Sequence, residues 1–412
     1  MDLTGKSLCG VKRKEVRARK PYQYAVSAAI LGWTLEAYEY FVVVFIVDAL
    51  AKEFHVPKGA IITTFVATLA MRPVGALLFG MMADRYGRRK PLLGITVYFL
   101  VIAALSGAAI NYPMFLILRA LYGIGMGGFW GVGASLALET APNRWRGILS
   151  GLIQAGYPLG YLLAAIMARL ILPVWGWRPM CWAGMLPTII TMLLIYGSQE
   201  SKAWDPRSSP NLREIIRQLW GHRRGFAYVV IALTLMVGLS HGTQDLYPDF
   251  LKTARGVSSN LVAEVAMIYS VGAILGAIAV GQGSELFGRR RAIAGALVIC
   301  VLAMPAWAFG KTLPAIAAGA FLMQVGVSGA WGVIPAHLSE LAPEGVRALF
   351  GGLAYQFGVL FGSPAGSVEY SLKNGYGYGW ALTIFESITI VSLAVVFWLG
   401  PENKGRKFSG DD

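Results

Sequence analysis

Long apolar runs separated by short polar segments are the dominant pattern in this chain. A run of about 20 apolar residues is long enough for an α-helix to cross the hydrocarbon core of a bilayer. The length and continuity of these runs exclude a β-barrel, whose strands are short and alternate in polarity. The pattern predicts an all-α membrane protein with twelve transmembrane helices, at approximately 22–49, 60–83, 90–110, 113–138, 146–172, 178–198, 225–251, 260–284, 291–310, 313–338, 347–370 and 378–400.

The longest polar connection divides the predicted helices into two groups of six. Within it, residues 211–220 have the pattern of a short amphipathic helix that lies on the membrane surface. The predicted organisation therefore has five parts: a basic tail at 1–21, a six-helix bundle at 22–198, a loop at 199–224, a second six-helix bundle at 225–400 and a tail at 401–412.

The two halves of the chain repeat one another at a constant offset of 201 residues, as in the step from 139 to 340. Such an offset over several segments indicates duplication. Two parallel six-helix repeats predict pseudo-symmetric bundles that alternate in access around a site near the bilayer midplane. The matching segments are 80–89 with 281–290, 130–132 with 331–333, 139–142 with 340–343, and Arg146 with Arg347.

Composition and charge agree with a membrane protein. The chain is 56% hydrophobic and 14% charged, with a net charge of +14. Seven of its 36 Lys and Arg lie in residues 1–20, and most others lie in the loops expected on the same side. This distribution follows the positive-inside rule, so it predicts both termini in the cytoplasm and an inner (plasma) membrane location, and it argues against nucleic acid as a partner. The basic N-terminus lacks a short apolar region with a cleavage site, so we expect no removable signal peptide.

Several kinds of chemistry are not expected. Cys9, Cys181 and Cys300 are too scattered for a disulfide framework or a metal site. Gly310-Lys311-Thr312 ends like a phosphate-binding loop, but Pro305 stands where that loop requires glycine. We therefore predict no enzyme activity and no cofactor, and a gradient as the source of energy, with the proton as coupling ion.

Charged residues inside the predicted spans are the candidate functional groups, because burying a charge in a bilayer is costly. Glu36 and Glu39 share a helix face, and two close carboxylates in a poorly hydrated cavity cannot both ionise easily. One of them can then carry a proton, although either could instead be a permanent counter-ion for an arginine. Arg119 cannot lose its proton and needs an anion, either one of these acids or a substrate carboxylate. Arg72 is similar, but lies closer to a helix break.

A second polar stretch interrupts the seventh predicted span. His241, Gln244 and Asp245 lie on one helix face, and Asp245 can pair with His241. We assign Arg119, His241, Gln244, Gln356 and Tyr38 to substrate binding, and Glu36, Glu39, His241 and Asp245 to proton coupling. Residues left as alternatives between substrate contacts and helix joining are Gln154 and Gln324, and those interpreted as membrane-interface residues are Glu264, Glu369 and Glu386.

The loop at 80–90 resembles the G-x-x-x-D-R-x-G-R-R/K signature of the major facilitator superfamily, and 401–406 resembles its P-E-T-K-G ending. The resemblance covers nearly the whole chain. It implies the major facilitator fold, and conformational gating by Asp84, Arg85, Arg88, Glu139, Arg146, Glu285, Arg289, Glu340 and Arg347. A carboxylate in this loop can cap a helix or pair with an arginine of a neighbouring helix.

Residues 240–245 resemble the N-x-x-S/T-H-x-S/T-Q-D-x-x-x-T signature of Jen-type lactate/pyruvate permeases, within the sialate:proton symporter family. The paired acids after Trp33-Thr34-Leu35 resemble that family too. Three positions depart from its patterns: Val237 and Val359 replace Asn, and Asp249 replaces Thr.

The resemblance implies proton-coupled symport of a small monocarboxylate by a monomer in the lipid bilayer. Sialic or sugar acids and aromatic acids remain alternative substrates, because the acid pair also resembles the D-G-x-D pattern of aromatic-acid symporters. A non-transporting sensor is an alternative from another class, and a drug exporter is a third.

Overall fold

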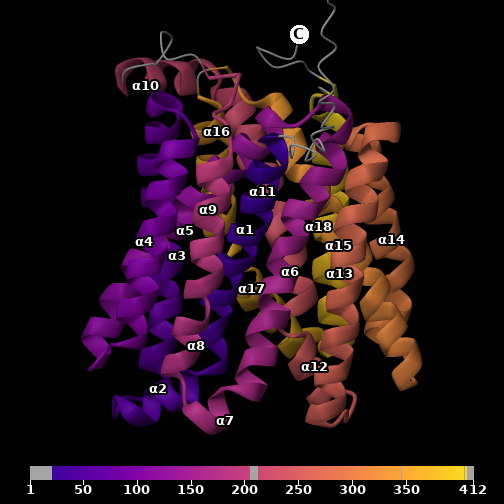
Figure 1. The fold of residues 1–412 in the computed structure, drawn as a ribbon. Coiled ribbons are helices and arrows are strands. Elements are labelled where there is room, and N and C mark those ends of the chain that lie inside the picture. Colours follow the sequence, from indigo (N-terminus) through magenta and orange to yellow (C-terminus); the bar gives the residue numbers. More distant parts are fainter. Residues whose placement is uncertain (1–20, 205–211, 345, 403, 406–412) are drawn as a thin grey trace, which may run out of the picture.

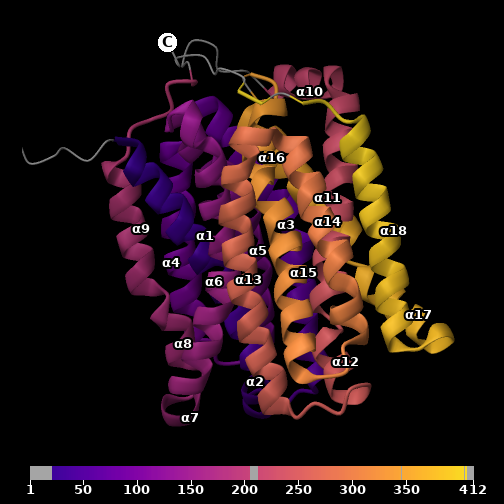
Figure 2. The same cartoon turned by 90° about the vertical axis from the view of Figure 1, so that its right-hand side faces the viewer.

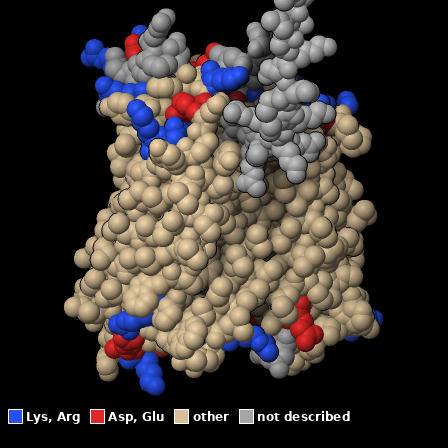
Figure 3. Space-filling model, viewed as in Figure 1, with Lys and Arg blue, Asp and Glu red and all other residues tan. Residues whose placement is uncertain are grey.

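The computed structural model describes residues 21–204, 212–344, 346–402 and 404–405, and within these ranges it contains helices and no strands. All but the last residue of the predicted basic tail at 1–21, and most of the tail at 401–412, lie outside the described residues. The helices run roughly parallel to one another as a single bundle (Figure 1). Charged side chains gather at its two ends, with an apolar belt between them (Figure 3), as a membrane protein requires.

Both halves contain six long helical segments, several of them broken once. The first half consists of α1 (Pro21–Phe45), α2 (Val47–Glu53), α3 (Lys58–Tyr86), α4 (Arg89–Gly107), α5 (Tyr112–Thr140), a 3-10 turn η1 (Asn143–Trp145), α6 (Arg146–Leu170), α7 (Leu172–Trp175), α8 (Arg178–Ala183) and α9 (Met185–Gly197). The predicted surface helix is present as α10 (Leu212–Gly221). The second half consists of α11 (Arg223–Gln244), α12 (Tyr247–Thr253), α13 (Ser259–Phe287), α14 (Arg289–Phe309), α15 (Leu313–Leu341), α16 (Arg347–Gly362), α17 (Ala365–Tyr376) and α18 (Tyr378–Leu399).

Eleven of the predicted spans are found in the described chain as helical segments long and apolar enough to cross a membrane. The span expected at 347–370 is instead divided into α16 and α17. Pro364 lies at the break, and proline cannot continue the hydrogen bonding of the preceding helix because it has no backbone N–H. The break places α17 beside the end of α11, where it bears on the site described below.

The two halves are joined at the end that carries α10, opposite α2, α7 and α12 (Figures 1 and 2). Asp84 of α3 accepts hydrogen bonds from the backbone nitrogens of Ala348 at 3.3 Å and Leu349 at 3.0 Å, and so caps α16 of the other half. Glu285 of α13 accepts from the nitrogen of Gly147 and caps α6 in the same way. The two caps are related by the internal repeat, because 348 lies 201 residues after 147.

Buried ion pairs complete this junction. Glu139 receives Arg88 at 3.1 Å and, from the other half, Arg347 at 3.2 Å. Burial alone would lower the pKa of Arg88, but the neighbouring Glu139 and Asp84 carboxylates hold it above its usual value. In the second half, Arg289 pairs with Glu340 at 2.7 Å and with Glu285 at 2.9 Å. We call these seven residues the latch: Asp84, Arg88, Glu139, Glu285, Arg289, Glu340 and Arg347.

Small residues bring the backbones of the two halves together beside the latch. A Cβ on Gly131 would lie 2.7 Å from the Cα of Gly352, and one on Gly281 would lie 2.9 Å from the Cα of Gly151. Ser150 donates to the carbonyl oxygen of Gly332 at 2.6 Å, so it also links the halves. Helices within a bilayer have no hydrophobic driving force for association, so they associate through close packing of this kind. The latch end is therefore closed.

Two further caps were not predicted from the sequence. The carboxylate of Glu200, after α9, accepts from the backbone nitrogens of Arg88 at 2.8 Å and Arg89 at 3.1 Å. Glu402, after α18, accepts from the nitrogens of Arg289 at 3.1 Å and Arg290 at 2.9 Å. In each half, the segment after the sixth span is thus tied to the start of the third span: α9 to α4 in the first half, and α18 to α14 in the second. The repeated placement of an acid just after the sixth helix was the available signal.

The latch predicts a stability effect. Glu139→Gln leaves Arg88 and Arg347 buried beside a neutral amide, and breaking a buried ion pair costs about 3–5 kcal/mol. We expect a clear fall in the apparent Tm of the purified protein in detergent. Glu264→Gln, the same change at an exposed position on α13, is the control and should leave Tm nearly unchanged. Equal Tm values for the two variants would contradict the role given to the latch.

Candidate functional site

The acid pair of α1 is buried and has no hydrogen-bond donor among the described residues. Glu36 and Glu39 are 2% and 6% exposed, and none of their carboxylate oxygens accepts a hydrogen bond from a described residue. Each acid interacts with a different arginine, Glu36 with Arg72 and Glu39 with Arg119. The two acids of one helix face are therefore influenced by two different cations, one from α3 and one from α5.

Arg119 is enclosed by the first half. Its Nη1 donates to the backbone oxygen of Glu39 at 3.3 Å, and its Nη2 donates to the hydroxyl of Ser106 at 3.1 Å. Its guanidinium carbon lies 4.5 Å from the centre of the Tyr122 ring. These contacts come from α1, α4 and α5, whereas we expected Arg119 to face a substrate between the halves. A sequence shows that an arginine lies within a span but not which neighbouring helix it faces.

Arg72 of α3 lies where Arg119 was expected. It is 3% exposed, and its Nε and Nη2 donate no hydrogen bond within the described part of the chain. Its guanidinium carbon lies 5.6 Å from the ring centre of Tyr355, which belongs to α16 of the other half. Arg72 also interacts electrostatically with Glu36 on its own side and with His241 across the interface. It is thus a cation between the halves, and two of its nitrogens have no hydrogen-bond acceptor among the described residues.

An aromatic layer separates this position from the latch. Trp130 of α5 stacks on Tyr355 with ring centres 4.5 Å apart. Trp33 and Trp331 approach the same tyrosine edge-on, at 6.3 Å and 5.8 Å. All four side chains are at most 7% exposed. Along α5, Trp130 lies between Arg119 and the latch residue Glu139. The layer therefore closes the interface on the latch side.

The polar stretch of α11 divides into two parts. Ser240 accepts from the indole nitrogen of Trp331 at 2.6 Å, and Gln324 joins Thr243 and Gln244 through two hydrogen bonds of 3.1 Å. These residues hold α15 against α11. Gln244 was expected to bind substrate, but its amide nitrogen is already used in this helix contact.

His241 and Asp245 form the second part. Nδ1 of His241 lies 2.9 Å from Oδ2 of Asp245, and the two side chains are 41% and 46% exposed. The predicted pair is therefore formed. It remains accessible to solvent, unlike the acids of α1, and its histidine interacts electrostatically with Arg72 of the other half.

The remaining predicted residues lie in different places. Gln356 donates to the carbonyl oxygen of Gly127 across the halves at 3.4 Å, and its own amide oxygen accepts nothing from the described residues. Gln154 accepts from the indole of Trp130 at 3.3 Å. Tyr38 does not lie with them, because its hydroxyl donates to the carbonyl oxygen of Met180 within the core of the first half.

Two acids were misplaced by the sequence interpretation. Glu369 and Glu386 were expected at the membrane interface, but both are 0% exposed. Glu264, interpreted in the same way, is exposed. The position of Glu386, well inside its predicted span, was a signal that the sequence did offer.

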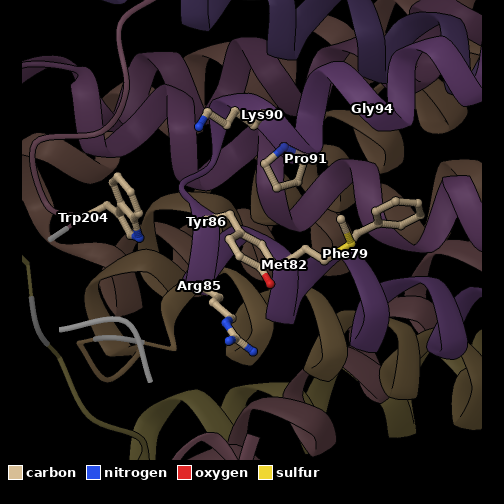
Figure 4. A pocket seen from close by; sticks show the side chains of 8 residues that line it. All are labelled: Phe79, Met82, Arg85, Tyr86, Lys90, Pro91, Gly94 and Trp204. Atoms are coloured by element: carbon tan, nitrogen blue, oxygen red, sulfur yellow. The ribbon is translucent and has the colours of Figure 1, made fainter. Parts of the chain in front are cut away.

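A surface groove of about 570 Å³ lies at the latch end, between α3 and α4 (Figure 4). Arg85, one of the predicted gating residues, lines it, and its guanidinium carbon is 5.3 Å from the ring centre of Tyr86. The groove shares no residue with the interface site around Arg72. Within the described ranges no cluster of His, Cys, Asp and Glu has the arrangement of a metal site.

Comparisons with known proteins agree with this architecture. The Major Facilitator Superfamily model matches residues 28–246, and a sugar (and other) transporter model matches residues 224–404. A solved structure of the proton:xylose symporter XylE covers 95% of this chain and 98% of its own at 20% identity, with a TM-score of 0.74. A solved structure of the human organic anion transporter MFSD10 covers 91% of this chain and 99% of its own at 16% identity, with a TM-score of 0.72.

Curated relatives are named as transporters. The carboxylic acid transporter protein homolog of Saccharomyces cerevisiae is 29% identical over 84% of this chain, which spans 60% of that protein's length. The sialic acid transporter NanX of Escherichia coli is 24% identical, covering 94% and 95% of the two chains. The 4-hydroxybenzoate transporter PcaK of Pseudomonas aeruginosa is 24% identical, covering 94% and 96%. With its two six-helix halves, its latch and these matches, the chain belongs to the Major Facilitator Superfamily of membrane transporters.

Proposed function

We propose that this protein is a secondary active transporter that carries a small monocarboxylate of the lactate or pyruvate type together with a proton, by alternating access. The observation that carries the proposal is the buried Arg72 between the halves, whose Nε and Nη2 donate no hydrogen bond within the described chain. These two nitrogens form the edge of a guanidinium that matches a carboxylate in bidentate geometry. A substrate carboxylate there would satisfy both.

Other polar groups around Arg72 complete the proposed anion site. The free amide oxygen of Gln356 can accept from a substrate hydroxyl or acid group. His241, across the interface, adds a donor and, when protonated, a positive charge. Arg119 then has another role, to stabilise the charge of Glu39 inside the first half.

Proton coupling is supported by the buried acids. Glu36 and Glu39 have no hydrogen-bond donor among the described residues, so neutralising one by protonation removes much of the cost of burying its charge. The solvent-accessible His241–Asp245 pair offers an entry point for that proton. Carrying one proton with one anion avoids the roughly 2.3 kcal/mol per 100 mV that moving a net charge would cost.

The closed latch supports an inward direction for the cycle. By the positive-inside rule, the loops of the latch end lie in the cytoplasm. A closed latch and an accessible His241–Asp245 pair then correspond to a state open to the outside. Substrate and proton bind from that side, the halves rock about the site, and the latch opens to release both into the cell.

The substrate class rests on the signature-like stretch at 240–245 and on relatives whose names include carboxylic acid, sialic acid and 4-hydroxybenzoate transporters. The departure at Val237 does not argue for a changed substrate, because this side chain packs against Gly362 within the second half.

Aromatic acids are a second candidate, favoured by the rings on the accessible side of Arg72. Phe41 lies 5.2 Å from Tyr157 and 4.9 Å from Tyr161 between ring centres. Tyr40, next to it in the chain, interacts electrostatically with both Arg72 and Asp245. Such a wall suits a planar substrate, since offset and edge-to-face ring contacts are favourable.

Labelled-lactate uptake into proteoliposomes tests the proposed activity. We expect an imposed inward proton gradient to drive accumulation, and collapse of the gradient with a protonophore to abolish it. Benzoate and sialic acid are then added as competitors, and the acid that competes best identifies the substrate class. If the proton gradient changes the uptake of none of these acids, the proposed coupling is wrong.

The two buried arginines make different predictions for binding. Arg72→Gln removes two charge-assisted hydrogen bonds of about 1.5 kcal/mol or more each, so we expect affinity for the transported acid to fall about 100-fold. Arg72→Lys keeps the charge but loses the bidentate geometry, so its affinity should lie between those of wild type and Arg72→Gln. Arg119→Gln is the matched control, and its affinity should change much less. Isothermal titration of the purified protein measures all three, and a larger loss for Arg119→Gln would reverse the assignment.

A further inference from the structure

We infer that Glu369 and Glu386 form a second buried proton site, in the C-terminal half, which exchanges protons with the His241–Asp245 pair. The inference rests on the proposed proton coupling and adds to it, because the proton sites considered so far are Glu36, Glu39 and that pair. It starts from the positions of two acids that the transport cycle above leaves without a role.

Glu386 of α18 is 0% exposed, and neither of its carboxylate oxygens accepts a hydrogen bond from the residues that the structure describes. Its carboxylate lies against Gly242 of α11, where an added Cβ would overlap the oxygen Oε1. Gly242 follows His241 directly in the signature-like stretch. A glycine at this position therefore makes room for a carboxyl group from another helix.

Glu369 of α17 is also 0% exposed, and its two oxygens likewise accept nothing within the described chain. It interacts electrostatically with both Asp245 and Glu386. The helix α17 lies close to Asp245, because a Cβ on Gly366 would be 3.6 Å from its Oδ2. Glu369 thus connects the accessible pair to the deeper acid.

Within the described part of the chain, neither Glu369 nor Glu386 forms an ion pair with a cation. Among the described residues, the titratable groups that interact electrostatically with Glu386 are Glu369 and, from α14, Cys300. Those that face Glu369 are Asp245, Glu386 and Tyr378. Lys373, on the same helix as Glu369, pairs instead with Asp249 at 3.6 Å.

An uncompensated charge in the bilayer interior costs at least about 2.5–3.5 kcal/mol, and two adjacent carboxylates cannot both ionise cheaply. Protonation removes that cost, so the pair can store a proton. A proton that enters at the His241–Asp245 pair passes to the Glu369 carboxylate and then to Glu386. Each transfer returns the donor to its unprotonated form and neutralises the acceptor carboxylate, so the total charge of the cluster does not change. The cluster gains one positive charge only when a proton is taken from water.

The pair is not a remnant of the duplicated scaffold. The repeat offset of 201 residues places Glu369 opposite Ala168 and Glu386 opposite Met185 in the first half. Conversely, it places Glu36 opposite Val237 and Glu39 opposite Ser240. Apart from the latch, the described part of each half therefore carries one buried acid pair, and the repeat does not relate the helices that carry them.

Infrared difference spectra of the purified protein between low and high pH test the site without transport. Wild type should show C=O bands of protonated carboxyl groups, and Glu369→Gln and Glu386→Gln should each remove part of that signal. Gly242→Ala keeps both acids but displaces Glu386, so it should shift the band. Glu264→Gln, at an exposed position, is the control. Spectra of all three site variants identical to wild type would overturn the proposal.

Transport in proteoliposomes tests the role of the site in coupling. We expect Glu369→Gln and Glu386→Gln each to lower gradient-driven uptake about tenfold or more, while substrate counterflow without a gradient stays within about twofold of wild type, since a neutral amide removes a proton step and not the anion site. Gradient-driven uptake unchanged in both variants would overturn the inference. Wild-type uptake that ignores the gradient would instead refute the proposed function, and the infrared result would still decide whether the site binds protons.

Discussion

The free energy of burying charge in an apolar bundle is the constraint on which this structure depends. At the latch, every buried charge named above has a partner: Glu139 holds two arginines, and Asp84 caps a helix of the other half. Between the halves the same constraint is left unmet, because Arg72 and the acids of α1 keep unused donors and acceptors. A transporter needs both situations, since satisfied charges define a stable state and unsatisfied ones give a ligand and a proton something to stabilise.

The internal repeat separates these two kinds of residue. The latch acids, their arginines and the caps on α6 and α16 occur in both halves at equivalent positions, so duplication accounts for them. Arg72 has Ala273 as its counterpart, and the buried acids likewise have uncharged counterparts. A scaffold that rocks symmetrically can be built from duplicated parts, but a site for one asymmetric substrate cannot. Charges that break the symmetry are therefore the best markers of the site.

The sequence predicted the helical class, the two halves and most spans, because apolar length and a constant offset are properties of the chain alone. It also predicted the His241–Asp245 pair, which one turn of helix brings together. It did not predict which arginine faces the interface, because that depends on how α3 and α5 are rotated against their neighbours. It did not predict the contact of Gln244 with Gln324 either, since the two residues lie 80 positions apart in the chain. The burial of Glu369 depends on the break at Pro364, which redirects α17.

The caps made by Glu200 and Glu402 have a mechanical consequence. Each fastens the end of a half's last helix to the start of its third, so a half forms a closed loop of covalent chain and hydrogen bonds. A closed loop resists internal shear, because sliding one helix would break a charged cap at the far end of another. Motion is then concentrated at the seam between the halves. These two glutamates allow the halves to behave as levers, so that an angular change at the latch becomes an opening at the opposite end.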